Sequence, residues 1–326
     1  MKIFITGATG FIGSQVVNRL TKTEHELFCL VRKTNQASER LKTLGAKLIT
    51  GDITDKASML QDMKGCDWVI HNAAVYSLWE PNNAIYKKVN VEGTRNVMEC
   101  ALEAKVSKVV YVSTAVVYGK PADVPYTEES ELGPIRFSKY SQSKYEAEQI
   151  VWDFHKNKGL PVVVINPCGV LGAGDPKASG SYISDIAHGR MPAKVLKNST
   201  LTWVYVKDVA EAIVRATEKP DNIGEKYLIG KYQLTITEFN KMISEITGVP
   251  LPKLSMPDFL TMAGAYMLTG LSNVFKFPPP MGMSVDQMRI MKEGFSVDGS
   301  KAEKELGLTY TPVRVAIEEE IAAEKQ

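Results

Sequence analysis

The sequence predicts an α/β fold: a Rossmann doubly wound parallel sheet followed by a smaller, mostly helical C-terminal lobe that binds substrate. Two observations predict it. Short β-branched runs alternate with longer amphipathic stretches through the first half of the chain, which is the pattern of a parallel sheet with helices on both faces. A glycine-rich turn, "TGATGFIG", also follows the first apolar run directly, as in dinucleotide-binding sheets.

The predicted elements follow in chain order. Strands are expected at Lys2–Thr6, Leu27–Val31, Lys47–Thr50, Trp68–Asn72, Lys108–Ser113 and Pro161–Asn166. Helices are expected between them at Phe11–Thr21, Ala37–Leu44, Lys56–Met63, Asn83–Ala104 and Ser138–Lys156. Further helices are expected at Lys207–Thr217 and Thr237–Thr247, after Gly and Pro have become frequent. We therefore predict a cofactor-binding domain over 1–166 and a substrate-binding lobe over 167–326, with a soft boundary because the chain can cross back.

Bulk properties predict a globular cytoplasmic protein. The 326 residues carry a net charge of +2, so charge gives no reason to expect nucleic acid or an anionic membrane as a partner. The cysteines are far apart without a C-x-x-C, which indicates reduced core thiols, and no histidine pair has zinc-site spacing. We expect no metal site. The oligomeric state is open, with a homodimer as one option.

Two segments bear on membranes. The first apolar run, "MKIFITGATG", enters a glycine turn at once and is too short for a signal peptide. The stretch from Phe259 to Phe275 is apolar, but it is short and contains Thr, Gly, Ser and Asn, below the length of a membrane span. We expect a buried or lid helix there and no stable membrane insertion.

The glycine turn predicts a dinucleotide site. Gly7, Gly10 and Gly13 have the spacing G-x-x-G-x-x-G between the first strand and the first helix. Glycine allows a tight turn and a close approach of pyrophosphate to the backbone, and the helix N-terminus offers free N–H groups. The candidate contacts in this turn are Gly7, Thr9, Gly10, Phe11, Ile12 and Gly13.

The ends of the next strands indicate which dinucleotide binds. Arg32 and Lys33 stand where an NAD site usually has an acidic residue, and a guanidinium suits a 2′-phosphate. We therefore predict NADP; the alternative is NAD with Arg32 stacked on adenine. "GDITD" and "HNAAVY" follow the third and fourth strands and supply the candidate contacts Asp52, Ile53, Ala73 and Ala74.

Taken together, the motifs resemble the extended short-chain dehydrogenase/reductase superfamily over nearly the whole chain. They are "TGATGFIG", "GDITD", "HNAA", "NVEGTRNV", "STAVVYG", "YSQSK" and "VYVKDVAEA", in that order. In that superfamily the catalytic unit is a Tyr-x-x-x-Lys pair with an upstream Ser or Thr. The resemblance therefore implies a Rossmann fold and proton transfer by a tyrosine.

Two Tyr-x-x-x-Lys matches occur, and helix periodicity selects one of them. Tyr227 and Lys231 lie in a predicted short strand and turn, whereas Tyr140 and Lys144 lie in a predicted helix, where positions i and i+4 share a face. Tyr145 has Gln149 at that spacing instead. A free tyrosine has a pKa near ~10, and we expect the nearby ammonium to lower it, so that Tyr140 acts as a general acid or base.

The resemblance implies roles for further residues. Thr114 in "STAVVYG" matches the catalytic Ser/Thr, with Ser113 as a neighbour that can share the role. Lys144 would also hold the nicotinamide ribose, and Asn90 matches a structural or proton-relay asparagine. "NPCGVLG" departs from the family pattern R-P-x-x-V-Y-G, with Asn166 for Arg and Leu171 for Tyr. The remaining implied cofactor contacts are Val112, Ser113, Tyr140, Lys144, Pro167 and Val170.

Sequence differences from related enzymes reduce the number of candidate reactions. Thr114 is followed by Ala115 and Val116 rather than the Asp-Glu pair of sugar-nucleotide dehydratases. Leu201 and Trp203 stand where epimerases carry a basic residue for a diphosphate. The stretches "YSLWEPNNAIYKKVNVEGTRNVM" and "HGRMPAKVLKNSTLTWVYVKDVAEA" resemble bacterial members of the dihydroflavonol-4-reductase branch, which include hopanoid-associated proteins named as sugar epimerases.

We therefore expect an NADP-dependent reductase of an apolar or aromatic aldehyde or ketone. The alternatives are an NAD-dependent nucleotide-sugar epimerase and a redox-sensing protein that binds cofactor without turnover. Apolar side chains that suggest the substrate pocket are Tyr76, Trp79, Met191, Trp203 and those of the Met-rich stretch Phe259–Met291. The sequence does not identify the substrate.

Overall fold

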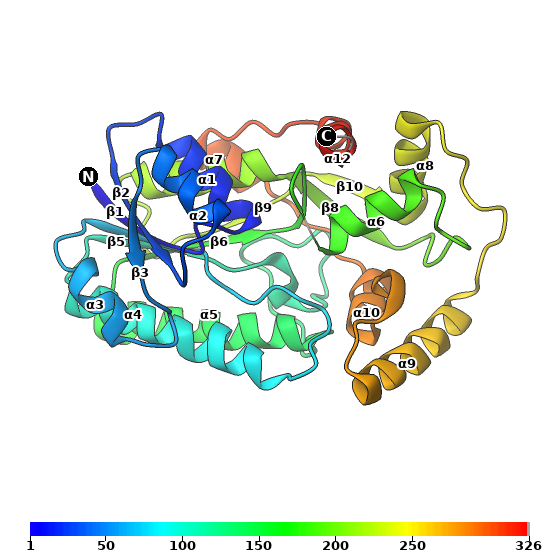
Figure 1. Cartoon of the computed structure of the whole chain (residues 1–326), viewed down its shortest axis with the longest axis horizontal. Coiled ribbons are helices and arrows are strands. Elements are labelled where there is room, and N and C mark those ends of the chain that lie inside the picture. Colours follow the sequence, from blue (N-terminus) through cyan, green and yellow to red (C-terminus); the bar gives the residue numbers. More distant parts are fainter. Residues whose placement is uncertain (176, 325–326) are drawn as a thin grey trace.

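A seven-stranded, all-parallel sheet forms the centre of the larger part of the molecule in this computed structural model, which describes residues 1–175 and 177–324 (Figure 1). Its strand order is β3-β2-β1-β4-β5-β6-β9. The strands are β1 (Lys2–Thr6), β2 (Glu26–Val31), β3 (Lys47–Thr50), β4 (Trp68–His71), β5 (Lys108–Val112), β6 (Val162–Pro167) and β9 (Lys226–Ile229). The order reverses at β1, so the loops after β1 and β4 border the crevice where such sheets bind ligands. The predicted fold class is confirmed.

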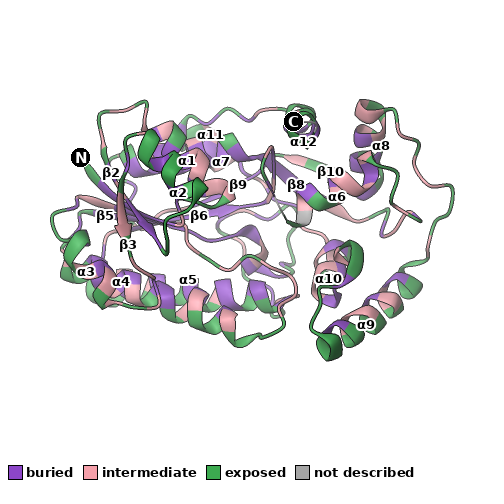
Figure 2. Cartoon of the chain, in the orientation of Figure 1, coloured by how far each residue is buried: buried purple, intermediate pink, exposed green. Residues whose placement is uncertain are grey.

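Helices cover both faces of this sheet (Figure 1). One face carries α1 (Phe11–Leu20), α2 (Gln36–Thr43), α7 (Val206–Glu218) and α11 (Ser300–Leu306). The other carries α3 (Ala57–Met63), α4 (Gly93–Glu103) and α5 (Lys139–Lys158). Figure 2 shows that the buried sides of these helices face the sheet. The predicted helix Asn83–Ala104 begins instead as the π-helical segment η1 (Tyr86–Glu92) before it continues as α4.

A smaller lobe packs beyond the carboxyl ends of the strands. It contains a three-stranded sheet of β7 (Gly169–Leu171), β8 (Thr200–Tyr205) and β10 (Tyr232–Thr235). Its helices are α6 (Ala178–Ala187), α8 (Ile236–Thr247), α9 (Asp258–Phe275), α10 (Val285–Glu293) and α12 (Val313–Glu324). Two short 3-10 turns, η2 (Ala115–Tyr118) and η3 (Pro280–Gly282), complete the described elements. The C-terminal region is therefore mostly helical, as predicted.

The chain returns to the large sheet after entering the smaller lobe. Strand β9 pairs in parallel with β6, and α7 packs against α1. Residues after 166 thus contribute to both parts, and the division into domains at this residue stays a prediction.

The apolar stretch near residue 260 is helical, as α9, but its outer side is not buried. Phe259 is 70% exposed and Val274 is 71% exposed. Of the two expected roles, the buried helix is therefore wrong for this side, and the lid helix stays a prediction. In the described part of the chain, we find no helix with the length and apolar character needed to cross a membrane. The four cysteines, in contrast, are buried free thiols as expected.

Candidate active site

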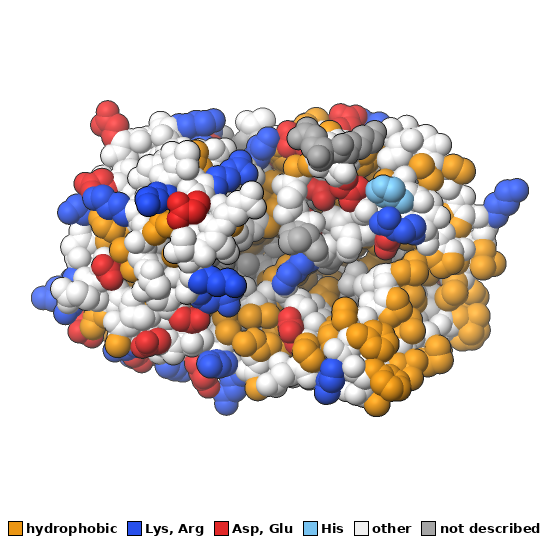
Figure 3. Space-filling view, viewed as in Figure 1, with side chains coloured by type: hydrophobic (Ala, Val, Ile, Leu, Met, Phe, Trp, Pro, Cys, Tyr) orange, Lys and Arg blue, Asp and Glu red, His pale blue; other side chains and the backbone are white. Residues whose placement is uncertain are grey.

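A cavity of about 520 Å³ lies at the carboxyl ends of the parallel strands, where the smaller lobe faces the large sheet. The surface is hollowed at this place in Figure 3. Every predicted catalytic or cofactor-binding residue except Gly13 lines the cavity. The lining members of that set are Gly7, Thr9, Gly10, Phe11, Ile12, Arg32, Asp52, Ile53, Ala73, Ala74, Val112, Ser113, Thr114, Tyr140, Lys144, Pro167 and Val170.

The glycine loop is shaped by close backbone approaches. Gly7 has a φ of +73°, and a Cβ there would lie 2.7 Å from the Ala73 nitrogen. A Cβ at Gly13 would lie 2.1 Å from the Gly7 carbonyl oxygen, so Gly13 serves helix–loop packing rather than the cavity wall. Helix α1 begins after Gly10 with no side-chain cap, which leaves N–H groups for an anion. Asn72, which the sequence reasoning passed over, donates to the Gly7 carbonyl oxygen at 3.4 Å.

The far end of the cavity suits a nucleotide. Arg32 is exposed at the end of β2, and no described residue forms a hydrogen bond or ion pair with its guanidinium. The Asp52 carboxylate is held in place because it accepts a hydrogen bond from the Thr54 nitrogen at 2.8 Å. The Ser113 hydroxyl, further along the cavity, is buried without a partner in the described chain. These groups fit a dinucleotide: a cation at one end, an open helix N-terminus, and an unpaired hydroxyl near the middle.

Tyr140 and Lys144 occupy the first turns of α5. Ser138 caps this helix, since its hydroxyl accepts from the Ser141 nitrogen at 2.9 Å. Both Tyr140 and Lys144 are buried and line the cavity. The Lys144 Nζ donates to the Val112 carbonyl oxygen at 2.8 Å. The helix therefore presents both side chains to the same space, one turn apart.

The electrostatics of this pair differ from the expectation. Burial raises the pKa of Tyr140, and the Thr114 hydroxyl opposes the shift only in part. Burial also lowers the pKa of Lys144 to about 7, opposed by the charge of Glu148. The expected lowering of the Tyr140 pKa by Lys144 is absent: burial raises the pKa instead, and the Lys144 Nζ donates to the Val112 carbonyl oxygen.

Two buried asparagines join the catalytic segments. Asn90 accepts from the Val75 nitrogen at 2.7 Å and donates to the Ser143 hydroxyl at 2.9 Å, which ties the loop after β4 to α5. Asn166 donates to the Thr114 carbonyl oxygen at 3.2 Å and to Glu148 Oε2 at 2.9 Å. The Asn that replaces Arg in the family pattern thus still links the Thr114 segment to α5.

The two other candidate tyrosines, Tyr145 and Tyr227, lie outside the cavity wall. Tyr145 is not part of the cavity wall, and the Arg136 guanidinium lies 4.3 Å from its ring centroid. The Tyr227 hydroxyl donates to Glu305 at 3.0 Å, whereas Lys231 forms an ion pair with Glu303 at 2.5 Å. Their side chains therefore have separate partners, and neither lines the cavity.

The substrate side of the cavity was predicted only in part. Tyr76, Trp203 and Met291 line it, whereas Trp79 and Met191 do not. The Tyr76 and Tyr140 rings make an edge contact with centroids 5.1 Å apart. Further lining residues come from the smaller lobe, where no motif marks them in the sequence: Asp175, Lys177, Ser179, Tyr182, Gln287, Ile290 and Phe295.

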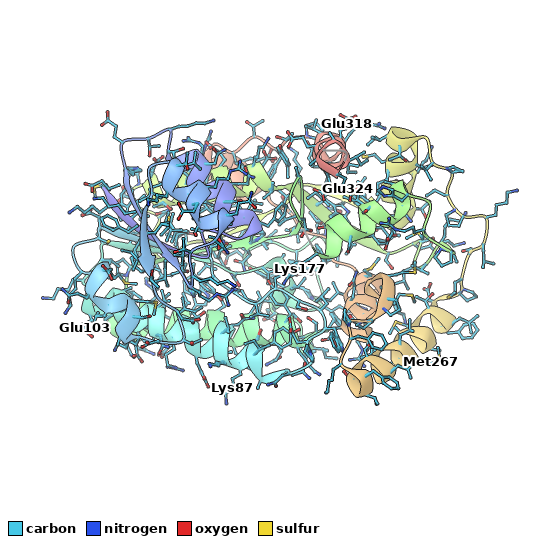
Figure 4. The ribbon with its side chains drawn as sticks, in the orientation of Figure 1. Lys87, Glu103, Lys177, Met267, Glu318 and Glu324 are labelled. Carbon is cyan, nitrogen blue, oxygen red and sulfur yellow. The ribbon has the colours of Figure 1, made fainter. Side chains whose placement is uncertain are left out.

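The loop after β7 borders the mouth of the cavity. Asp175 is buried and accepts from the Ser179 hydroxyl at 2.5 Å and the Lys177 nitrogen at 3.0 Å. Lys177 Nζ donates to the Tyr76 carbonyl oxygen at 2.5 Å. Figure 4 shows Lys177 between the large sheet and α10. This contact joins the two parts of the molecule next to the catalytic tyrosine candidate.

Comparisons with known proteins agree with this geometry. The model of the NAD dependent epimerase/dehydratase family matches residues 3–230. The chain is 31% identical over 325 residues to a Synechocystis sp. protein with the provisional name dihydroflavonol 4-reductase, covering 96% of this chain and 92% of that protein. It is 29% identical over 325 residues to sterol demethylase protein B of Methylococcus capsulatus, covering 99% of this chain and 98% of that protein. The crystal structure of gox2253 superposes with a TM-score of 0.84 at 36% identity, over 99% of this chain and 98% of that one.

Proposed function

Because the chain belongs to the NAD dependent epimerase/dehydratase family, we propose that it is an NADP-dependent reductase of an apolar or aromatic aldehyde or ketone. The family comprises NAD(P)-dependent oxidoreductases and epimerases that act on small molecules, so its membership alone allows both reactions. The observation that carries the proposal is the chemistry of the cavity wall beside Tyr140.

Much of that wall is apolar, and its described residues include no cation free to clamp a diphosphate. Leu201, Trp203 and Met291 form part of it. Among the described lining residues, the cations are Arg32, Lys144 and Lys177. Arg32 lies at the nucleotide end, and both lysines donate to backbone carbonyls at Val112 and Tyr76. A mainly apolar pocket with few polar groups favours a small hydrophobic ligand over a nucleotide sugar.

The residues present suit proton delivery to a carbonyl oxygen. A bound reduced nicotinamide would supply a hydride to the carbonyl carbon. Tyr140, a phenol and therefore protonated at neutral pH, would donate its proton to the oxygen, so that hydride and proton together give the alcohol. The Thr114 hydroxyl would donate a hydrogen bond to the same oxygen, and Lys144 would hold the ribose.

Two further observations support the choice of NADP as cofactor and of an apolar substrate. The guanidinium of Arg32 has no partner among the described residues and suits the 2′-phosphate that distinguishes NADP from NAD. Two relatives that match nearly the whole chain are named for a dihydroflavonol reductase and a sterol demethylase, and neither name is that of a nucleotide-sugar epimerase.

The test compares carbonyl reduction with sugar isomerisation. A panel of apolar and aromatic carbonyls is assayed by NADPH absorbance, and UDP- and dTDP-sugars are assayed for product isomers. We expect NADPH consumption with the carbonyls. Tyr140→Phe should lower turnover by ~100-fold or more with NADPH binding retained, while Tyr145→Phe, the matched control in the same helix, should be nearly silent.

Other results would identify the alternatives. Sugar isomerisation without net cofactor consumption, together with NAD in the denatured, freshly purified protein, would mean that the chain is an epimerase. Tight NADPH binding with no turnover of either panel would favour the redox-sensing alternative. Equal effects of the two tyrosine substitutions would refute the assignment of Tyr140.

A further inference from the structure

Helix α9 exposes most of its large apolar side chains, whereas an ordinary surface helix buries them. Its fully buried residues, Thr261, Ala265 and Ser272, are small or polar, and Met262 packs partly buried against the core of the smaller lobe. Its outward positions are large and apolar, and we call the exposed members of this side the α9 face. The α9 face consists of Phe259, Leu260, Tyr266, Met267, Leu271, Val274 and Phe275.

The α9 face is a continuous apolar surface without charge. Between Asp258 at its first turn and Lys276 after its end, the helix has no acidic or basic residue. Figure 3 shows hydrophobic side chains gathered over this part of the molecule, at the lower right. A continuous patch of several exposed, large apolar side chains, such as the seven of the α9 face, marks an interaction site in soluble proteins.

Two polar contacts with segments distant in the chain hold α9 in this orientation. The Thr269 hydroxyl accepts from the Val285 nitrogen at 2.9 Å, at the start of α10. Asn273 Oδ1 accepts from Trp79 Nε1 at 3.0 Å, on the loop before η1. Rotation of the apolar side inward would break the hydrogen bonds of Thr269 and Asn273.

Basic residues border the α9 face. Lys253 precedes the helix, Lys276 follows it, and Arg289 donates to the Tyr266 hydroxyl at 2.6 Å. All three are exposed, and none forms an ion pair with an acidic residue within 1–175 and 177–324. Lys87, likewise without an ion pair there, lies on the same edge of the molecule as Met267 (Figure 4). An apolar strip bordered by unpaired cations matches the chemistry of acyl chains beneath anionic headgroups.

We propose that the α9 face docks on an anionic lipid surface, with the helix lying in the plane of the headgroups and its apolar side chains among the acyl chains. Helix α10 packs against α9 and contributes Gln287, Ile290 and Met291 to the cavity wall. Docking would therefore bring the substrate side of the cavity next to the bilayer. A lipid surface fits better than a second copy of the chain, because the cations and the adjoining apolar cavity both have a use at a membrane.

Vesicle sedimentation tests the proposal without requiring turnover, so its failure is distinguishable from failure of the proposed reductase. The full chain is mixed with phosphatidylcholine vesicles, with or without one-third phosphatidylglycerol. The variant Phe259→Gln, Met267→Gln, Val274→Gln changes the α9 face. The matched control Leu102→Gln, Ile135→Gln, Ile223→Gln changes exposed apolar residues elsewhere. Circular dichroism and thermal unfolding verify that both variants are folded.

We expect the wild type to sediment with the anionic vesicles, the α9-face variant to bind about ten-fold or more weakly, and the control to bind like the wild type. Lys253→Ala with Lys276→Ala should reduce the preference for anionic over neutral vesicles. No sedimentation of the wild type, or unchanged binding by the α9-face variant, would overturn the proposal. A wild-type dimer in ultracentrifugation that the α9-face variant abolishes, without vesicle binding, would also overturn it and identify a second copy as the occupant.

Discussion

Replacing Lys144 by Met should stabilise the protein while abolishing its turnover. Lys144 is buried, and burial lowers its pKa to about 7 from the 10.5 of a free lysine. The unfolded chain keeps this lysine charged at neutral pH, so folding must desolvate or discharge it. The pKa difference corresponds to a cost of about 4 kcal/mol at pH 7.

One loss reduces the gain from the substitution. Methionine cannot donate to the Val112 carbonyl oxygen, a hydrogen bond of 2.8 Å that contributes ~1 kcal/mol. The attraction of Glu148 for the ammonium is already contained in the pKa of about 7. A net increase of about 2–3 kcal/mol in the free energy of unfolding at pH 7 is therefore expected.

The stability gain of Lys144→Met should depend on pH in a definite direction. Because the folded pKa lies below the unfolded pKa, the unfolded state binds more protons between pH 7 and about 10.5, and wild-type stability rises with pH there. The advantage of Lys144→Met should be largest below pH 7 and shrink towards pH 10. Urea unfolding of the cofactor-free proteins at three pH values measures it, with the exposed neighbour Lys139→Met as control, expected within about 0.5 kcal/mol of wild type. Destabilisation at pH 6.5, or a gain independent of pH, would refute the reasoning.

Three further predictions concern the cofactor site and the fold. Arg32→Ala should weaken NADPH binding by ~1.5–3 kcal/mol and leave NADH nearly unchanged; equal wild-type affinities for the two cofactors in titration would contradict this. Burial near Asp175 raises the pKa of Glu320 to about 7, above its unfolded value, so the contribution of Glu320 to the free energy of unfolding falls as pH rises to 7. Glu320→Gln should therefore stabilise the protein by up to about 3 kcal/mol at pH 8 but little at pH 5. Urea unfolding with no such pH difference would contradict this. Gly13→Ala should lower the yield of folded protein, because its Cβ would lie 2.1 Å from the Gly7 carbonyl oxygen; wild-type thermal stability would show that the loop relaxes.

The cofactor half of the cavity could be predicted closely because it is built from local patterns. Each loop follows a strand of a parallel sheet, and the carboxyl ends of such strands meet at one edge. Arg32, Asp52 and Ala73 therefore converge although long stretches of chain separate them. Helix periodicity likewise placed Tyr140 and Lys144 on one face, because that spacing is a property of any helix.

What the sequence by itself determined, then, is the doubly wound sheet, its ligand edge and the residues that the family motifs mark. Only the tertiary structure decided the substrate wall, since its residues come from elements without a periodic or motif signal: Lys177 reaches the Tyr76 carbonyl oxygen across 101 positions, and Ile290 lines the cavity from α10. The upward direction of the Tyr140 pKa shift was also decided by the tertiary structure, because desolvation depends on everything packed around the phenol rather than on the lysine four residues away. The outward side of α9 was decided in the same way, by the polar contacts of Thr269 and Asn273 with segments distant in the chain.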